Sequence, residues 1–135
     1  MELGFYVSAK WQLVDEVRRA FALIQEKGHH ITEDWTTHES VKPYDKEPET
    51  SARFAELDLT GVLESDVFIH LSDGKGTGKY IELGAAMASF VYIGSPRIYI
   101  IGENNNESQF YMHPSVNRKK TVEEVLKEIT EISAE

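Results

Sequence analysis

The chain has 135 residues, which is the length of a single domain spanning 1–135. Hydrophobic residues make up 41% of it, enough for one packed core, and the lack of cysteine excludes disulfides and thiolate chemistry. The formal net charge is −9 and the longest basic run is Arg118-Lys119-Lys120, which argues against nucleic acid or an anionic membrane surface as a partner. A small molecule is therefore the expected ligand.

The N-terminal stretch MELGFYVSAKW lacks the basic region and the long apolar run of a signal peptide. No apolar stretch is long enough to span a bilayer. These features predict a cytoplasmic protein without a membrane partner.

Apolar runs and helical spacing predict strands that alternate with helices. In chain order we expect a strand at 3–7, a helix at 13–24 closed by Gly28, a strand at 30–35, a polar loop at 36–49, a helix at 52–63, a strand at 66–71, a helix at 81–91, strands at 97–101 and 110–112, and a helix at 122–132 capped by Thr121. The fully apolar strands predict an α/β fold, a single-domain flavodoxin/Rossmann-like three-layer sandwich with a mainly parallel sheet of four to five strands. Ligands of such sheets bind beyond the carboxyl ends of the strands.

The segment DGKGTGKYIELGAA, residues 73–86, lies at one of these ends. A Walker loop requires glycine at residue 73 and a hydroxyl side chain after Lys79, whereas this chain has Asp73 and Tyr80. The alternating glycines also fail the dinucleotide pattern GxGxxG. We therefore interpret the segment as a glycine loop that opens a helix near Glu82.

Two carboxylates, Glu82 and Asp58, are the candidate catalytic residues. Free N–H groups and the positive end of the helix favour an anion in the first turn and would keep Glu82 ionised, as a nucleophile requires. Asp58 lies beside an apolar helix stripe, where an unused charge is costly. The two together match the pair that cleaves glycosidic bonds with retention. The alternatives are that Glu82 only stabilises a helix end and that Asp58 pairs with Arg53.

Three motifs then resemble the nucleoside 2-deoxyribosyltransferase family, which includes nucleoside 5′-monophosphate N-glycosidases. They are FYVSAKW at 5–11, DLTGVLESDVFIHL at 58–71 and GTGKYIELGAAMA at 76–88. Together they span most of residues 5–90, and their order and separation carry the resemblance more than any one motif does.

The resemblance implies that Glu82 attacks the anomeric carbon, that Asp58 handles the proton of the leaving base, and that Tyr6 holds Glu82 by a hydrogen bond. The implied substrate-binding residues are Ser8, Ala9, Trp11, Asp73, Gly76, Thr77 and Gly78. The expected reaction is transfer of a 2-deoxyribosyl group between bases, with hydrolysis of a nucleoside 5′-monophosphate as the alternative, and it needs no cofactor. The resemblance also implies a homo-oligomer with a shared active site, to which 110–117 is the candidate contribution.

The chain departs from the family at residue 76. Family transferases often carry an aspartate six residues before the nucleophile to hold sugar hydroxyls, and this chain has Gly76 there, with Asp73 as the candidate substitute. A non-catalytic nucleotide-binding module with the same fold therefore stays open as a further alternative.

The remaining polar residues suggest no second chemistry. Adjacent His29 and His30 point to opposite faces of a strand and, with His38, have no carboxylate at ligand spacing, so we expect no metal site. His70 ends a strand and either faces the site or is a hydrogen-bonded core residue. Trp35 either stacks on a base or packs in the core.

Overall fold

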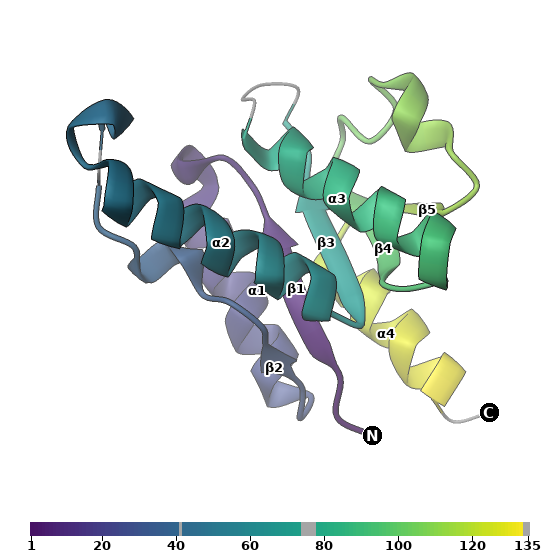
Figure 1. The fold of residues 1–135 in the computed structure, drawn as a ribbon. Helices are drawn as coiled ribbons and strands as arrows, with labels where there is room; N and C mark the ends of the chain where they lie inside the picture. Colours follow the sequence, from purple (N-terminus) through teal and green to yellow (C-terminus); the bar gives the residue numbers. More distant parts are fainter. Residues whose placement is uncertain (41, 74–77, 134–135) are drawn as a thin grey trace.

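The computed structural model describes residues 1–40, 42–73 and 78–133. These residues form a five-stranded sheet of order β2-β1-β3-β4-β5 in which every pairing is parallel. The strands are β1 (Gly4–Ser8), β2 (His30–Ile31), β3 (Val67–Leu71), β4 (Arg97–Ile101) and β5 (Val116–Lys119). The helices of the same part of the chain are α1 (Val14–Glu26), α2 (Pro48–Glu64), α3 (Gly78–Ile93) and α4 (Val122–Ser133). The predicted α/β class and parallel sheet are confirmed (Figure 1).

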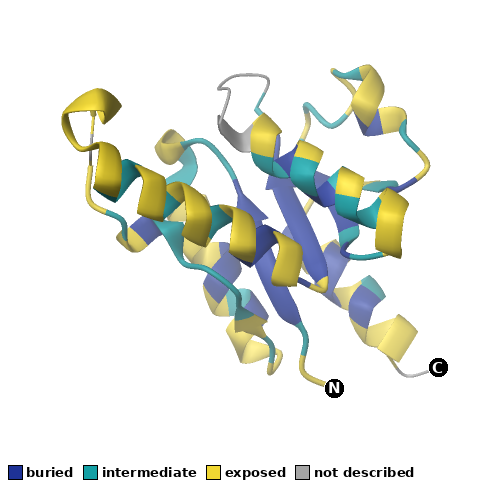
Figure 2. Ribbon diagram, in the orientation of Figure 1, coloured by how far each residue is buried: buried dark blue, intermediate teal, exposed yellow. Residues whose placement is uncertain are grey.

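Alternate residues of β1 face opposite sides of the sheet. Phe5 and Val7 pack with α1 and α4 on one side, and Tyr6 packs with α2 and α3 on the other. Because helices cover both sides, β1 and β3 are buried along their whole length (Figure 2). Tyr6, a predicted site residue, therefore lies in the layer of α2 and α3.

The second strand is shorter than predicted. Only residues 30–31 pair with β1, and the N–H of Thr32 makes one more bond, to the carbonyl of Phe5 at 2.9 Å. The Thr32 hydroxyl then donates to the carbonyl of Gly61 in α2 at 2.7 Å. Residues Trp35–Thr37 turn as a 3-10 helix, so the predicted strand at 30–35 is wrong beyond residue 31.

The predicted fifth strand at 110–112 is also wrong. Residues Gln109–Met112 form a 3-10 turn, in which Ser108 accepts a hydrogen bond from the N–H of Phe110 and Tyr111 is buried. The fifth strand is β5, which pairs with β4. Its sequence, VNRK, is polar because it lies at the edge of the sheet, so an apolar run could not reveal it.

The predicted helices are all present, with moved boundaries. Gly28 ends α1 with a φ of +87°, a conformation that favours glycine. Thr121 caps α4 by accepting a hydrogen bond from the N–H of Glu124 at 3.2 Å. The predicted loop at 36–49 contains a second 3-10 turn, Tyr44–Lys46, and ends where α2 begins, at Pro48. None of the helices in the described ranges combines the length and apolar character needed to cross a membrane.

Candidate active site

Two side chains of β1 meet one carboxylate at the carboxyl end of the sheet. Tyr6 and Ser8 are two residues apart and so project to the same side. The Tyr6 hydroxyl donates to Oε2 of Glu82, and the Ser8 hydroxyl donates to Oε1 of Glu82 at 3.0 Å. The predicted contact of Tyr6 is present. Ser8, which the resemblance assigned to the sugar 5′ end, contacts the carboxylate.

The packing of α3 aims Glu82 at β1. Leu83 and Ala86 are buried against the sheet on the α2/α3 side and fix the rotation of the helix about its axis. With both oxygens of Glu82 held by hydroxyl groups, the carboxylate has a defined orientation. A nucleophile benefits from such positioning because the reacting atoms must be aligned before the bond forms.

Burial controls the charge of Glu82. It raises the pKa of Glu82 to about 7; the hydrogen bonds from Tyr6 and Ser8 lower the pKa, and the charge of Asp58 raises it. Burial and the nearby Glu82 also raise the pKa of Tyr6, which stays a hydrogen-bond donor. The predicted place of Glu82 in the first helical turn is not observed, because Glu82 is the fifth residue of α3. Burial is the largest cause of its pKa shift.

Asp58, on α2, lies near the Glu82 carboxylate. Its Oδ1 is buried, has no hydrogen-bond partner among the described residues, and lies 3.7 Å from Nδ1 of His38. Burial raises the pKa of Asp58 to about 6, while His38 lowers it and Glu33 raises it. An ion pair between Asp58 and Arg53 is absent from the described part of the chain, where the Arg53 guanidinium lies 5.4 Å from the ring centre of Phe54.

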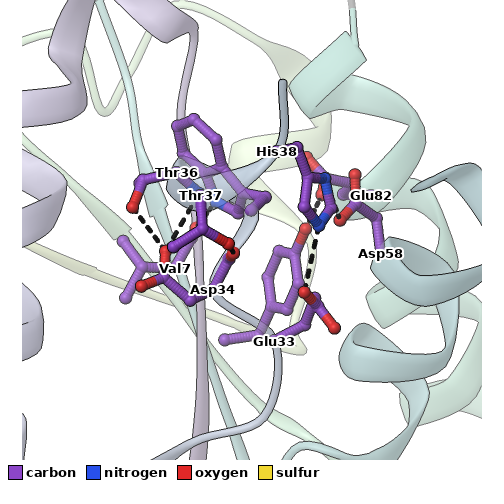
Figure 3. Close-up of polar contacts among 10 residues, drawn as sticks. Val7, Glu33, Asp34, Thr36, Thr37, His38, Asp58 and Glu82 are labelled. Carbon is purple, nitrogen blue, oxygen red and sulfur yellow. Dashed lines mark hydrogen bonds and ion pairs between the residues drawn. The ribbon is translucent and has the colours of Figure 1, made fainter. Parts of the chain in front are cut away.

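Glu82 and Asp58 lie beside each other in the site (Figure 3). Their charges interact, because Asp58 is one cause of the raised pKa of Glu82. With pKa values of about 7 for Glu82 and about 6 for Asp58, the pair can hold a proton near neutral pH, and the higher value places that proton first on Glu82. Nucleophilic attack by Glu82 therefore requires the form of the pair in which Glu82 is ionised and Asp58 carries the proton.

Glu33 and His38 also lie here, and no role was predicted for either of them. Nε2 of His38 is 3.1 Å from Oε2 of Glu33, and the His38 ring stacks on Phe54 with centroids 4.2 Å apart and an 8° interplanar angle. Their position after β2, at the carboxyl edge, was the available signal. The stretch ITEDWT has no periodicity that would have shown which side chains turn toward α2.

The expectation that no carboxylate approaches the histidines is therefore wrong for His38. Ligand atoms of Glu33, His38 and Asp58 lie within 4.8 Å of one another, close enough for a metal ion to bridge. His29 and His30 are not part of this group. Nδ1 of His29 accepts a hydrogen bond from the N–H of Leu3 at 3.0 Å, and His30 pairs with the exposed Glu2.

Gly61 lets these groups approach one another. A Cβ at this position of α2 would lie 2.6 Å from Cβ of Glu33 and 3.1 Å from Cδ2 of Tyr6. Real Cβ atoms do not come that close to another carbon, so α2 packs against β1 and Glu33 only with glycine here. This close approach brings the helix of Asp58 to the strand of Tyr6.

Other predicted site residues have varied surroundings. Asp73 forms an ion pair with Lys10, and Ala9 packs against the core on the α1/α4 side. Trp11 is 54% exposed, with its ring centre 5.9 Å from that of Trp35. Gly76 and Thr77 lie outside the described residues, and of Gly78 only its place at the start of α3 is described.

Trp35 and His70 are parts of the packed interior. Nε1 of Trp35 donates to the carbonyl of Val7 at 2.6 Å, and its ring packs against the cores on both sides of the sheet. His70 is fully buried, and its Nε2 lies 3.3 Å from the hydroxyl of Tyr111. These contacts favour the core interpretation for both residues.

Comparison with known proteins supports the architecture. No family model and no curated protein matches the chain. Among solved structures, the fold is similar to that of the Clostridium botulinum CMP N-glycosidase BcmB, with a TM-score of 0.63 and 18% sequence identity. The similarity covers 94% of this chain and 97% of that one. The two chains thus share one fold over nearly their full lengths.

Proposed function

We propose that the protein cleaves the N-glycosidic bond of a nucleoside or nucleotide, with Glu82 as the nucleophile. The observation that carries this proposal is the Glu82 carboxylate held at both oxygens by Tyr6 and Ser8, beside a second carboxylate, Asp58. An ionised nucleophile and a second carboxyl group that can carry a proton are what such a bond cleavage requires.

In the first step Glu82 forms a bond to the anomeric carbon as the bond from that carbon to the base nitrogen breaks. The electron pair of the broken bond goes to the base, which receives a proton from Asp58. In the second step an acceptor attacks the glycosyl ester, its proton goes to Asp58, and the Glu82 carboxylate is released. The overall reaction is balanced without any redox group, since every step moves only protons and electron pairs.

We infer that the substrate is a nucleoside 5′-monophosphate and that water is the acceptor. The full-length fold similarity to a CMP N-glycosidase supports this choice. Gly76, in place of an aspartate that would hold sugar hydroxyls, is also consistent with a substrate other than a free nucleoside. Transfer of a 2-deoxyribosyl group to a second base is the other candidate, supported by the motif resemblance at 5–11, 58–71 and 76–88.

We also propose that the chain assembles with copies of itself. Helix α3 exposes Ile81, Val91 and Tyr92, which are 68%, 63% and 87% accessible, on a helix that is apolar on all sides. A helix of this kind usually lies in an interface. A partner copy there would lie beside the helix that carries Glu82, in keeping with the shared active site that the resemblance implies.

A product assay tests the proposed reaction. Purified protein is incubated with a nucleoside monophosphate alone, and separately with a deoxynucleoside and a different free base. Free base from the monophosphate, absent with Glu82→Gln, would establish an N-glycosidase. A new nucleoside in the second mixture would establish a transferase. No product from either mixture, with wild type equal to Glu82→Gln, would contradict the proposal and favour a binding module.

A further inference from the structure

One chain of polar groups in the site is not used by the reaction above. His38 lies between two carboxylates, with Nε2 3.1 Å from Oε2 of Glu33 and Nδ1 3.7 Å from Oδ1 of Asp58. All three side chains are mostly buried, at 20%, 14% and 28% exposure for Glu33, His38 and Asp58. Figure 3 shows the His38 ring directed at the Asp58–Glu82 side of the site.

The ring of His38 is fixed in this place. It stacks on Phe54 of α2, and the backbone N–H of His38 donates to the carbonyl of Trp35 at 3.1 Å. The turn before it is closed by Asp34, which accepts hydrogen bonds from the N–H and hydroxyl of Thr36. His38 is thus held by the turn on one side and by α2 on the other, so its nitrogens keep their separate partners.

The contact with Glu33 decides which nitrogen can exchange a proton. A carboxylate accepts but does not donate, so Glu33 selects the tautomer with hydrogen on Nε2. The other nitrogen, Nδ1, then points its lone pair at Asp58 in the neutral ring and donates a proton in the charged ring. Oδ1 of Asp58 is buried without a hydrogen-bond partner in the described ranges. A small rotation or one bridging water would connect it to Nδ1.

A metal ion fits the same three residues less well. An ion takes only one ring nitrogen, whereas the two carboxylates lie at different nitrogens of His38. The arrangement instead matches a carboxylate–imidazole–carboxylate chain, in which each nitrogen has its own acid.

We propose that His38 is a positioning residue that acts through Asp58, exchanging a proton with it during each turnover. This inference rests on the proposed glycosidase function. Asp58 and Nδ1 of His38 share one proton, which passes from Asp58 to the leaving base in the first step and leaves a neutral ring beside an ionised carboxylate. When the acceptor attacks, its proton passes to Asp58 and the initial protonation of the chain is restored.

The charges around this chain come from three elements. Tyr6 on β1, Glu82 on α3, and Asp58 with Arg53 on α2 surround it, together with Glu33 from its own segment. His38 lowers and Glu33 raises the pKa of Asp58. Removing each of these two residues should therefore move the titration of Asp58 in opposite directions. A merely structural role for His38 would not produce opposite shifts.

The test measures Asp58 directly and through activity. The titration of the Asp58 carboxyl is followed by carbon-13 NMR in wild type, His38→Gln and Glu33→Gln, with Asp58→Asn to assign the signal. We expect the midpoint to rise in His38→Gln and to fall in Glu33→Gln. The exposed His30→Gln, which changes the same residue type at the amino end of the sheet, is the matched control and should leave the midpoint unchanged.

The kinetic arm uses hydrolysis of a nucleoside monophosphate. His38→Gln should lower kcat about 10- to 100-fold with little change in KM and move the alkaline limb of the pH profile upward, a smaller loss than the about 100- to 10,000-fold that the general acid itself contributes. The same change in an Asp58→Asn background should cause no further loss. An unchanged Asp58 midpoint in a folded His38→Gln variant would overturn the proposal. Shifted midpoints in a protein with no turnover would refute the glycosidase function alone.

Discussion

The two carboxylates of the site are held by different kinds of structure. Glu82 is fixed by hydroxyl groups of β1, a central strand buried over its whole length. Asp58 is contacted by a histidine from the segment after β2, outside regular strand structure. The strand supplies neutral donors that orient Glu82, whereas the segment supplies titrating groups that adjust the charge of Asp58. Hydroxyl groups on a buried strand fix the position of the nucleophile, whereas charged side chains beside the acid change its pKa.

The largest effect should come from Glu82→Gln. The amide keeps the size of the side chain but is not a nucleophile, so turnover of the monophosphate should fall by at least about a thousandfold. Release of free base, measured by chromatography, checks this result. Glu131→Gln, on the outer surface of α4, is the control and should retain wild-type activity. Comparable activity in the two variants would remove Glu82 from the chemistry.

Asp58→Asn should have the next largest effect. Loss of the acid should lower the rate about 100- to 10,000-fold for a base that must be protonated as it leaves. For a substrate whose leaving group needs no proton, the loss should be much smaller. Rates of the variant on both kinds of substrate give the comparison. Equal losses on both substrates would show that Asp58 acts in some other way.

Tyr6→Phe should have a moderate effect with a characteristic pH signature. The hydrogen bond from Tyr6 lowers the pKa of Glu82, so its removal raises that pKa. Glu82 must be ionised to attack, and the acid limb of the profile should therefore move to higher pH. At neutral pH we expect a loss of about tenfold. A rate–pH series from pH 5 to about 9 measures the limb, and an unmoved limb would contradict the proposed contact.

The smallest expected effect is on stability. Because burial raises the pKa of Glu82 from 4.5 to about 7, the folded state binds more protons than the unfolded one, and stability falls as pH rises through this range. Glu82→Gln should thus raise the free energy of unfolding at pH 8 by on the order of 2 kcal/mol, and with it the melting temperature. At pH 4 the substitution should have little effect. Asp58→Asn should show a smaller gain. Thermal unfolding of both variants at pH 8 and pH 4 measures these gains. Equal gains for the two variants would contradict the deeper burial of Glu82.

The sequence predicted the parts of the molecule that depend on apolar patterning. The buried strands β1, β3 and β4 and all helices follow from such patterns. Glu82 was placed by the glycine loop that opens its helix, and Tyr6 was named only through the resemblance of the motif at 5–11. The edge strand β5 was missed because a polar edge has no apolar run. His38 was missed because its partners come from elsewhere in the chain, through a turn that side-chain hydrogen bonds close. The raised pKa of Glu82 was not predicted, because burial depth is a tertiary property.

Gly61 offers a handle for engineering. It is the point where the backbone of α2 approaches both Tyr6 and Glu33, and it carries no ionisable group. Adding a single methyl group there would act as a spacer, widening the gap between the helix of the acid and the strand of the nucleophile without altering any titrating residue. Substitutions of increasing size at residue 61 therefore provide a graded adjustment of the distance between these two elements.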